Sequence, residues 1–493
     1  MLWTVVVLVM GAIALVLGVP TTGDEGYFTD TVWAIQHGLW ACAYPPKVGP
    51  SLAVPMTYIA PLYPLIGGLL AALAHVGSSV AFPSAAAMGP HCRGALSAMY
   101  RWSRATHAGV ATQWLGLVTL VPLVFAVAAH PVAGSSRPRR VEVGSALLVA
   151  TSLPILSAFG QFAHPQDILT AALAWVGVAA AIRGRWIAAG VALGLAVAAH
   201  QVALLALIVV FLCVESEGRR RLVAAAAAAA AAVYLPLLVA GGPSSWAAIL
   251  MGSGFNNSAG GTVVFELGLP VPLKFAVSRG AALVTAALLV RWYRRAHPGP
   301  VEPVTMVALV TIGFGLRLVF ENNLWGYYFI PIVVGLIILD RRRGRIRAGT
   351  IAWILVQLAL FNWLAIGSSD RSLVLASWPL YFGQIAAAGV VAVMAGRAIL
   401  RQHDRAPWVA ALLAYALAFV VSPHLWHMAV QFWPVWVDQL ILVPWAIGLA
   451  WTALPPRPGA DESVGHRSAP RRAPGTMGAW IRPGRARGVI AER

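Results

Sequence analysis

Two adjacent carboxylates, Asp24 and Glu25, stand where the chain leaves its first apolar segment, Leu2 to Gly18. A carboxylate at the boundary between water and lipid can act as a general base for a hydroxyl group while a lipid-borne leaving group stays in the membrane. The same pair can equally be a solvated helix cap that does no chemistry. Asp24 and Glu25 are therefore the first candidates for catalysis, with capping as the alternative.

Histidine and aspartate occur together further along the chain. His164 and Asp167 flank Pro165, and proline favours the first turn of a helix, so their relative geometry is fixed. Such a pair can bind sugar hydroxyls or orient a general base. Alternatively, Asp167 caps the helix and His164 lies at the membrane interface. A divalent metal held by Asp24, Glu25 and His164 is a third hypothesis, which their spacing does not favour.

Basic and aromatic side chains lie near the ends of later apolar segments. Arg317 is near the outer end of one segment, and Lys274 and Arg279 are at the start of another. A guanidinium group matches the geometry of a phosphate, although such residues can also simply extend to lipid headgroups. Tyr327 and Tyr328 open the next segment, where they either belong to an interfacial aromatic belt or stack on a sugar ring or an isoprenoid.

These residues interrupt a chain that is otherwise strongly apolar. Of its 493 residues, 59% are hydrophobic and only 11% are charged, whereas soluble globular proteins carry about 25% charged residues. Apolar runs that approach the ~20 residues of a membrane-spanning helix recur from end to end. The composition excludes a soluble globular protein and predicts an all-α polytopic membrane protein with about 12 to 14 transmembrane helices.

One apolar stretch, Met56 to Val76, is treated differently from the others. It is long enough to span, but counting it as a span places Arg137, Arg139 and Arg140 outside the cell. We therefore interpret it as an interfacial or re-entrant segment of the first outer loop. After the anchor helix, spans are then expected at about 107–129, 144–162, 167–182, 186–199, 201–214, 222–242, 273–292, 303–319, 327–340, 349–366, 373–396, 407–422 and 434–452. The short segments 186–199 and 201–214 form either two spans or a hairpin of half-depth.

The charge distribution supports this topology. Lys+Arg number 35 against 17 for Asp+Glu, a net charge of +18, and most of the basic residues fall on one side of the predicted membrane. The positive-inside rule then predicts a plasma-membrane protein with both termini in the cytoplasm, so the charge needs no nucleic-acid partner. The predicted organisation is a signal-anchor helix at 1–19, a first extracytoplasmic loop at 20–106, a transmembrane core at 107–340, C-terminal transmembrane helices at 341–454 and a disordered basic cytoplasmic tail at 455–493.

Most of the unusual polar residues fall on the outer face in this topology. Ionisable groups at a membrane boundary are costly unless they line a wet cavity, form pairs or do chemistry. We therefore expect a substrate cavity on this face, lined by Tyr27, His164, Gln166, Asp167, His200, Gln201, Glu321, Asn322, Tyr327 and Tyr328. Cys42 and Cys92 lie in the first outer loop, where they either form a disulfide or stay unpaired.

Several of these segments resemble a known family. The sequences Gly23–Phe28, Gly160–Asp167 and Trp186–Ala196 resemble those of GT-C glycosyltransferases, integral membrane enzymes that use polyprenyl-phosphate sugars. The segment from Arg317 to Tyr328 is similar to a late loop in the mannosyltransferase-like branch of actinobacterial type. The resemblance covers most of residues 1–340 and implies a GT-C-like fold.

The resemblance also implies a reaction. A sugar, mannose in preference to arabinose, would pass with inversion from a polyprenyl-phosphate donor to a cell-envelope lipid or glycan acceptor on the extracytoplasmic face. Asp24 would deprotonate the acceptor hydroxyl, Glu25 would orient the acceptor, and Arg317 would neutralise the leaving phosphate. His200 stands where relatives often carry lysine, which implies a weaker or pH-dependent phosphate contact.

Two other functions are compatible with a polytopic membrane protein. A lipid-linked sugar flippase or transporter would need charged residues or broken helices at mid-span, which the predicted spans lack. A catalytically inactive scaffold of the same fold would lose only stability on removal of Asp24 and Glu25.

Overall fold

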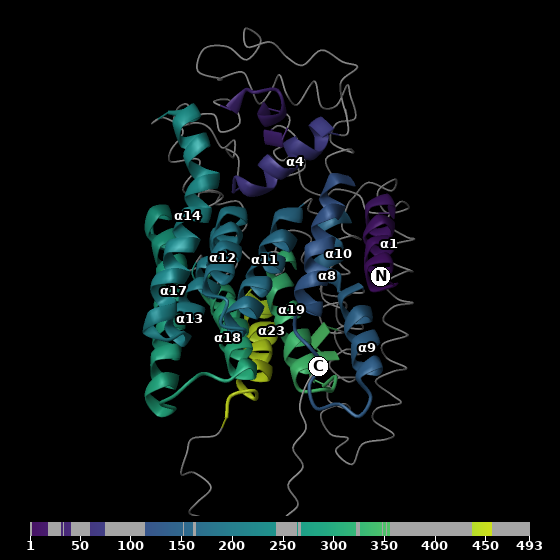
Figure 1. Cartoon of the computed structure of the whole chain (residues 1–493), viewed down its shortest axis with the longest axis vertical. Helices are drawn as coiled ribbons and strands as arrows, with labels where there is room; N and C mark the ends of the chain where they lie inside the picture. The colour runs from purple at the N-terminus through teal and green to yellow at the C-terminus, as the bar shows by residue number, and fades with distance from the viewer. Residues whose placement is uncertain are drawn as a thin grey trace, which may run out of the picture. The chain divides into compact units, whose positions relative to one another are not determined.

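A computed structural model of the chain describes residues 2–17, 31–32, 34–40, 60–73, 114–150, 152–160, 164–242, 264, 268–321, 326–347, 349–351, 353–354 and 436–455. All of them belong to one compact unit, Met1–Pro455. Every regular element within these ranges is a helix, in agreement with the predicted all-α class (Figure 1). The predicted spans at 373–396 and 407–422, together with Cys42 and Cys92, lie outside the described residues.

The described elements are α-helices with a few short 3₁₀ turns (η) between them. In chain order they are α1 Leu2–Leu17, α4 Leu62–Leu73, η2 Leu117–Thr119, α8 Leu120–Ala128, α9 Pro138–Ala150, α10 Leu153–Gly160, α11 Pro165–Ile182, α12 Trp186–Ala199, η3 Gln201–Ala203, α13 Leu204–Cys213, α14 Ser216–Gly241, α17 Val271–Ala296, α18 Pro303–Phe320, η4 Gly326–Phe329, α19 Ile330–Arg342 and α23 Trp436–Trp451.

Three helices in the described part of the chain are long and apolar enough to cross a membrane, namely α11, α14 and α18. Three further apolar stretches, Trp114–Ala128, Trp186–Ala199 and Gln201–Cys213, are shorter. At about 1.5 Å per residue, α12 and α13 are each too short to cross a hydrocarbon layer of about 30 Å. These helices agree with an all-α membrane protein, while the number and orientation of its spans stay predictions.

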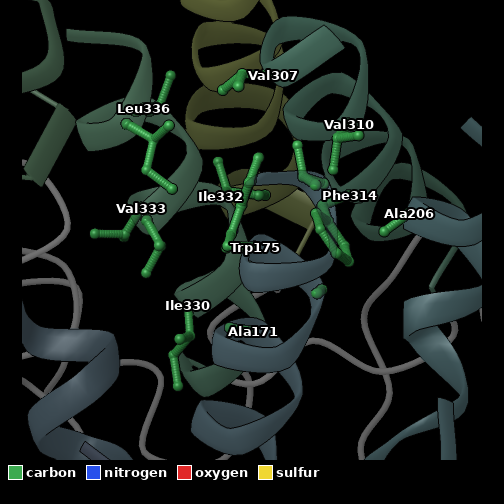
Figure 2. Packing of buried hydrophobic residues seen from close by; sticks show 14 of the residues in the cluster. Ala171, Trp175, Ala206, Val307, Val310, Phe314, Ile330, Ile332, Val333 and Leu336 are labelled. Atoms are coloured by element: carbon green, nitrogen blue, oxygen red, sulfur yellow. The ribbon is translucent and has the colours of Figure 1, made fainter. Parts of the chain in front are cut away.

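The core lies where α11, α13, α18 and α19 pack together. Figure 2 shows Trp175 of α11 close to Ile332 of α19 and Phe314 of α18. Trp175 is fully buried, and its ring centroid lies 6.2 Å from that of Phe314. Its indole N–H donates to the carbonyl of Pro331 at 3.1 Å, which satisfies a donor that would otherwise be buried without a partner. This bond joins the middle of α11 to the start of α19.

Small residues bring α12 and α14 close together. A Cβ added at Gly190 would lie 2.3 Å from the carbonyl oxygen of Leu222, and one added at Gly194 would lie 2.2 Å from that of Ala226. The alanine run Ala224–Ala232 supplies the facing surface on α14. Glycines and alanines allow two helix backbones to approach closely, as is common among membrane helices.

Turn residues set the direction of α11 and α12. Pro165 occupies the first position of α11, where its fixed φ suits a helix and its missing N–H costs nothing. After α11, Gly184 adopts a φ of 72°, a left-handed conformation that glycine tolerates best. The chain then reverses into α12, so the first turn of α11 and the last turn of α12 lie at the same end of the pair.

The segment predicted as one span at 144–162 is divided into α9 and α10. The Ser152 N–H donates to the carbonyl of Val149 at 3.3 Å, which tightens the backbone after α9. Pro154 follows within the first turn of α10 and has no N–H to continue the helical hydrogen bonds. Proline therefore interrupts a stretch whose apolar length alone predicts a continuous helix.

Helix α4 lies within the stretch that the sequence places at the membrane interface. Its residues Leu62 and Tyr63 are buried in a small cluster with Leu169 of α11 and with Ala198 and Ala199 of α12. These partners come from the beginning of α11 and the end of α12. Helix α4 thus packs against helix ends, and its place at a membrane interface stays a prediction.

Candidate functional site

Polar side chains from four parts of the chain meet at one end of the packed helices. His164 precedes α11, and His200 lies between α12 and η3. Arg317 is in the last turn of α18 and Glu321 directly follows it, while Tyr327 is in η4. All five side chains are buried. The sequence predicts each of them as a site residue, and the contacts below join them into one group.

Asp167 lies between two histidines. It occupies the first turn of α11, three residues after His164, so both side chains lie on the same face of the helix. Its Oδ2 lies 3.4 Å from Nδ1 of His164, and its Oδ1 lies 4.0 Å from Nε2 of His200. The predicted alternative, a helix cap with an interfacial histidine, does not describe these contacts, because both histidines face the carboxylate inside the protein.

The protonation of His200 follows from its surroundings. The backbone N–H of Val202 donates to Nδ1 at 3.2 Å, so the ring proton is on Nε2, which faces Asp167. Burial lowers the pKa of His200 to about 3 and outweighs the opposing attraction of Asp167. His200 is therefore a neutral donor at physiological pH, and the pH-dependent contact implied by the family resemblance does not fit this position.

Arg317 and Glu321 form a buried ion pair. The Arg317 Nε donates to Oε2 of Glu321 at 2.8 Å across one turn at the end of α18. Ser278 of α17 donates its hydroxyl to Oε1 of the same carboxylate at 3.3 Å. Burial alone would raise the pKa of Glu321, but Arg317 and Arg279 outweigh it and hold the pKa below its usual range. Glu321 is therefore ionised and fixes one edge of the guanidinium group.

Two tyrosines connect this ion pair to the histidines. The ring of Tyr327 stacks on His164 with centroids 4.0 Å apart and an interplanar angle of 13°. Tyr328 meets Tyr327 edge to face at 4.9 Å, and the guanidinium carbon of Arg317 lies 4.0 Å from the centre of the Tyr328 ring. Both rings therefore pack within the site.

Three polar atoms of the site are buried without a hydrogen-bond partner among the described residues. They are Oε1 of Gln166, Oδ2 of Asp167 and Nη2 of Arg317. Native proteins rarely leave such atoms unsatisfied, and those that remain call for an explanation such as a bound ligand. The three atoms offer two acceptors and one charged donor, which suits a ligand that carries both hydroxyl groups and an anionic group.

The remaining predicted residues differ in their placement. Arg279 of α17 interacts electrostatically with His200 and Glu321, so it belongs to the site. Lys274 of α17 and Gln201 of η3 are half-buried. Four predicted residues lie outside the described part of the chain, so the structure says nothing of their placement: Asp24, Glu25, Tyr27 and Asn322.

Ser278 is the contributor that the sequence does not reveal. It is 2% exposed and stands beside Arg279 on α17, 43 residues from the carboxylate that it contacts. A serine in an apolar helix is common and carries no signal by itself. Only the packing of α17 against α18 makes its hydroxyl a partner of Glu321.

The predicted metal hypothesis depends on residues that the structure does not describe. Within the described ranges, no three His, Cys, Asp or Glu side chains are placed to hold a metal ion. The hypothesis also needs Asp24 and Glu25, which lie outside those ranges.

The described residues of the site provide a positioned guanidinium group, a carboxylate between two imidazoles and two aromatic faces. No protein-family model and no curated protein matches the chain.

Proposed function

We propose that the protein is an integral membrane glycosyltransferase. It transfers a sugar, mannose in preference to arabinose, from a polyprenyl-phosphate donor to a cell-envelope lipid or glycan on the extracytoplasmic face. The observation that carries the proposal is the buried guanidinium group of Arg317, which is fixed on one edge by Glu321 and whose Nη2 has no hydrogen-bond partner in the part of the chain that the structure describes. This Nη2 can donate a hydrogen bond to a phosphate oxygen.

The surroundings of Arg317 suit an anionic group that arrives from the membrane. Helix α18 is apolar and long enough to cross a bilayer, and Arg317 lies in its last turn. Glu321 and the Tyr328 ring hold the guanidinium group in one orientation, so it does not reorganise when charge develops on a ligand. Fixed charges of this kind stabilise a leaving group more effectively than mobile ones do.

The acceptor atoms around Asp167 suit the hydroxyl groups of a sugar. Its Oδ2 is buried and lacks a hydrogen-bond partner among the described residues, as does Oε1 of the neighbouring Gln166. Both atoms can accept hydrogen bonds from sugar hydroxyls. The Tyr327 ring stacks on His164 and so holds this histidine in place beside Asp167.

The proposed reaction is an inverting displacement at the anomeric carbon. The acceptor hydroxyl attacks this carbon, and the bond between the carbon and the phosphate oxygen breaks. The hydroxyl proton passes to the carboxylate of Asp24, and the bonding electron pair leaves with the polyprenyl phosphate. In this proposal Glu25 orients the acceptor, and Arg317 balances the negative charge that grows on the leaving phosphate.

Sugar transfer in proteoliposomes tests the proposal. A panel of labelled polyprenyl-phosphate sugars and a mixed envelope-lipid acceptor are supplied to the wild type and to Asp24→Asn. We expect transfer from one donor by the wild type and a loss of about 10²-fold or more in the variant, as for removal of a general base. A parallel sample with EDTA measures any metal requirement, and we expect no effect.

Other outcomes would favour the alternative functions. If the folded protein transfers no sugar but moves labelled donor across the bilayer at a rate that Asp24→Asn leaves unchanged, the protein is a flippase. If neither activity occurs and removal of both Asp24 and Glu25 alters only stability, it is an inactive scaffold. Either result contradicts the proposed glycosyltransferase.

A further inference from the structure

A second group of polar side chains lies at the other end of α11, away from the candidate functional site. His130 follows α8, Arg183 follows α11, and Arg341 and Arg342 end α19. The Nε of Arg341 donates to the carbonyl of His130 at 3.1 Å, and Nη2 of Arg342 lies 3.4 Å from Nδ1 of His130. Arg183 donates to the carbonyl of Ala129. Three guanidinium groups therefore converge on a single turn, residues 129–130.

His130 adds no charge to this group. It is fully buried, and burial lowers its pKa to about 3, with the charge of Arg342 acting in the same direction. Its Nε2 lies 3.1 Å from the carbonyl of Trp175, which can only accept, so the ring proton is on Nε2. Nδ1 is then the acceptor for Arg342, and His130 acts as a neutral link between α11 and α19.

Among the described residues, the nearby carboxylates do not balance the three arginines. Glu142 interacts with one of them, Arg341. Asp340 is occupied by Arg347, whose Nε donates to its Oδ1 at 2.5 Å and whose backbone N–H donates to its Oδ2 at 2.9 Å. Arg183 and Arg342 are left close enough to repel each other. Arg183 is exposed and Arg342 is half-buried, so an anion that reaches both from the surface would relieve their repulsion.

Arg342 also offers a donor for such an anion. Its Nε is buried and has no hydrogen-bond partner among the residues that the structure describes. The backbone beside it is fixed, because Gly344 has a φ of 68° and a Cβ there would lie 2.1 Å from the carbonyl oxygen of Ala133. The loop after α8 therefore closes tightly on the end of α19 and holds Arg342 in position.

The depth of the group suits a lipid headgroup. Helix α11 is apolar over its 18 residues, a length of roughly 27 Å at 1.5 Å per residue, and the hydrocarbon layer is about 30 Å thick. Arg183 directly follows this apolar length. The guanidinium groups therefore lie at the level where lipid phosphates begin, and basic pockets between helices at this level bind anionic headgroups.

We propose that Arg342 and Arg183, held around the turn at His130, bind the phosphate group of an anionic membrane lipid. The phosphate oxygens accept a hydrogen bond from Nε of Arg342 and balance the charge that the carboxylates of the described residues leave uncompensated. A guanidinium group suits this role better than an ammonium group because its planar edge matches two phosphate oxygens. The site is independent of sugar transfer.

Lipid binding by the purified full chain tests this proposal. Phosphatidylglycerol, phosphatidylcholine or inorganic phosphate is added in detergent, and retained lipid is counted by native mass spectrometry while the melting temperature is recorded. The test variant is Arg342→Gln, and the matched control is Arg345→Gln, which removes the same charge from an exposed position in the same segment. We expect phosphatidylglycerol alone to be retained and to raise the melting temperature of the wild type.

The variants should respond differently. We expect phosphatidylglycerol to bind Arg342→Gln about tenfold more weakly, the loss typical of one charge-assisted hydrogen bond, and to bind Arg345→Gln as it binds the wild type. Equal losses in both variants would overturn the proposal, since they would show general attraction to a basic segment. An equal response to inorganic phosphate would overturn the lipid as the ligand. If Arg342→Gln does not fold, Arg342→Lys keeps the charge, and wild-type binding by that variant would contradict the guanidinium site.

Discussion

His200 and His130 each follow the end of a helix, and both side chains are buried. In each case burial lowers the pKa to about 3. The backbone N–H of Val202 donates to Nδ1 of His200, and Nη2 of Arg342 faces Nδ1 of His130. Both rings therefore act as neutral hydrogen-bonding links rather than as charge switches near neutral pH. Whether a histidine in a sequence is a switch or a link depends on burial, which its neighbours along the chain do not specify.

This behaviour has a consequence for stability. As the pH falls from about 6.5 towards 3, each unfolded histidine binds a proton that the folded protein excludes, so stability should fall with pH. His200→Gln removes one such group, and His130→Gln removes the other. We expect the melting temperature, recorded in detergent between pH 4 and pH 8, to depend less steeply on pH in each variant. Slopes equal to that of the wild type would show that these histidines titrate alike in the folded and unfolded states.

The buried pair of Arg317 and Glu321 should show strong coupling. Arg317→Gln leaves a carboxylate buried without its main counter-ion, and we expect a loss of about 3–5 kcal/mol in the free energy of unfolding. Arg317→Gln combined with Glu321→Gln removes both charges, so it should cost less than Arg317→Gln alone. Ser278→Ala removes one hydrogen bond and should cost about 1 kcal/mol. Denaturation of the wild type and these three variants measures the differences, and a double variant that loses as much as Arg317→Gln or more would contradict the coupling.

At the scale of elements, α12 and α14 pack closely together. Gly194→Ala places a methyl group 2.2 Å from the carbonyl oxygen of Ala226, which cannot move without displacing the α14 backbone. We expect the loss of about 1–3 kcal/mol that is typical of overpacking. Gly280→Ala is the matched control, because a Cβ there meets nothing within 4 Å and alanine favours a helix.

Melting temperatures of the two glycine variants test whether α12 and α14 approach as closely as the structure shows. Gly194→Ala should melt well below the wild type, and Gly280→Ala should melt at the same temperature or higher. If both variants melt like the wild type, the helices have room between them and the close approach is wrong.

The sequence predicts single helices better than their partners. The apolar run between Arg185 and His200 predicts a helix over 186–199, and α12 has these bounds. That α14 lies against it does not follow from apolar length, because the pairing depends on the shape of a glycine surface. Similarly, Pro154 divides 144–162 into two helices. A count of apolar residues does not include this effect of proline.

At the scale of the whole molecule, the described helices have two polar ends joined by an apolar core. Helix α11 carries both, with Asp167 in its first turn and Arg183 directly after its last. The sequence predicts that His164, His200, Arg317 and similar residues share one face, because successive spans alternate in direction. It does not predict which of them touch, since contacts such as that of Ser278 with Glu321 depend on the rotation of each helix about its own axis.

The two polar ends should also behave independently. The site around Arg317 is proposed to bind a donor phosphate, and that around Arg342 a structural lipid, and they lie at opposite ends of α11. Substitutions more than about 10 Å apart with no shared partners usually act additively. Loss of lipid binding at Arg342 should therefore lower stability without changing which donor is used in the proposed sugar transfer.

The most direct test of the proposed function is the initial rate of sugar transfer at increasing donor concentration for the wild type, Arg317→Lys and the control Arg345→Lys. Both variants keep their charge, but only Arg317→Lys removes the guanidinium edge from the buried site. We expect Arg317→Lys to fold and to lose about 10²-fold in kcat, as for removal of one charge-stabilising donor, while Arg345→Lys keeps the wild-type rate. A wild-type rate in Arg317→Lys would contradict the proposed role of this site.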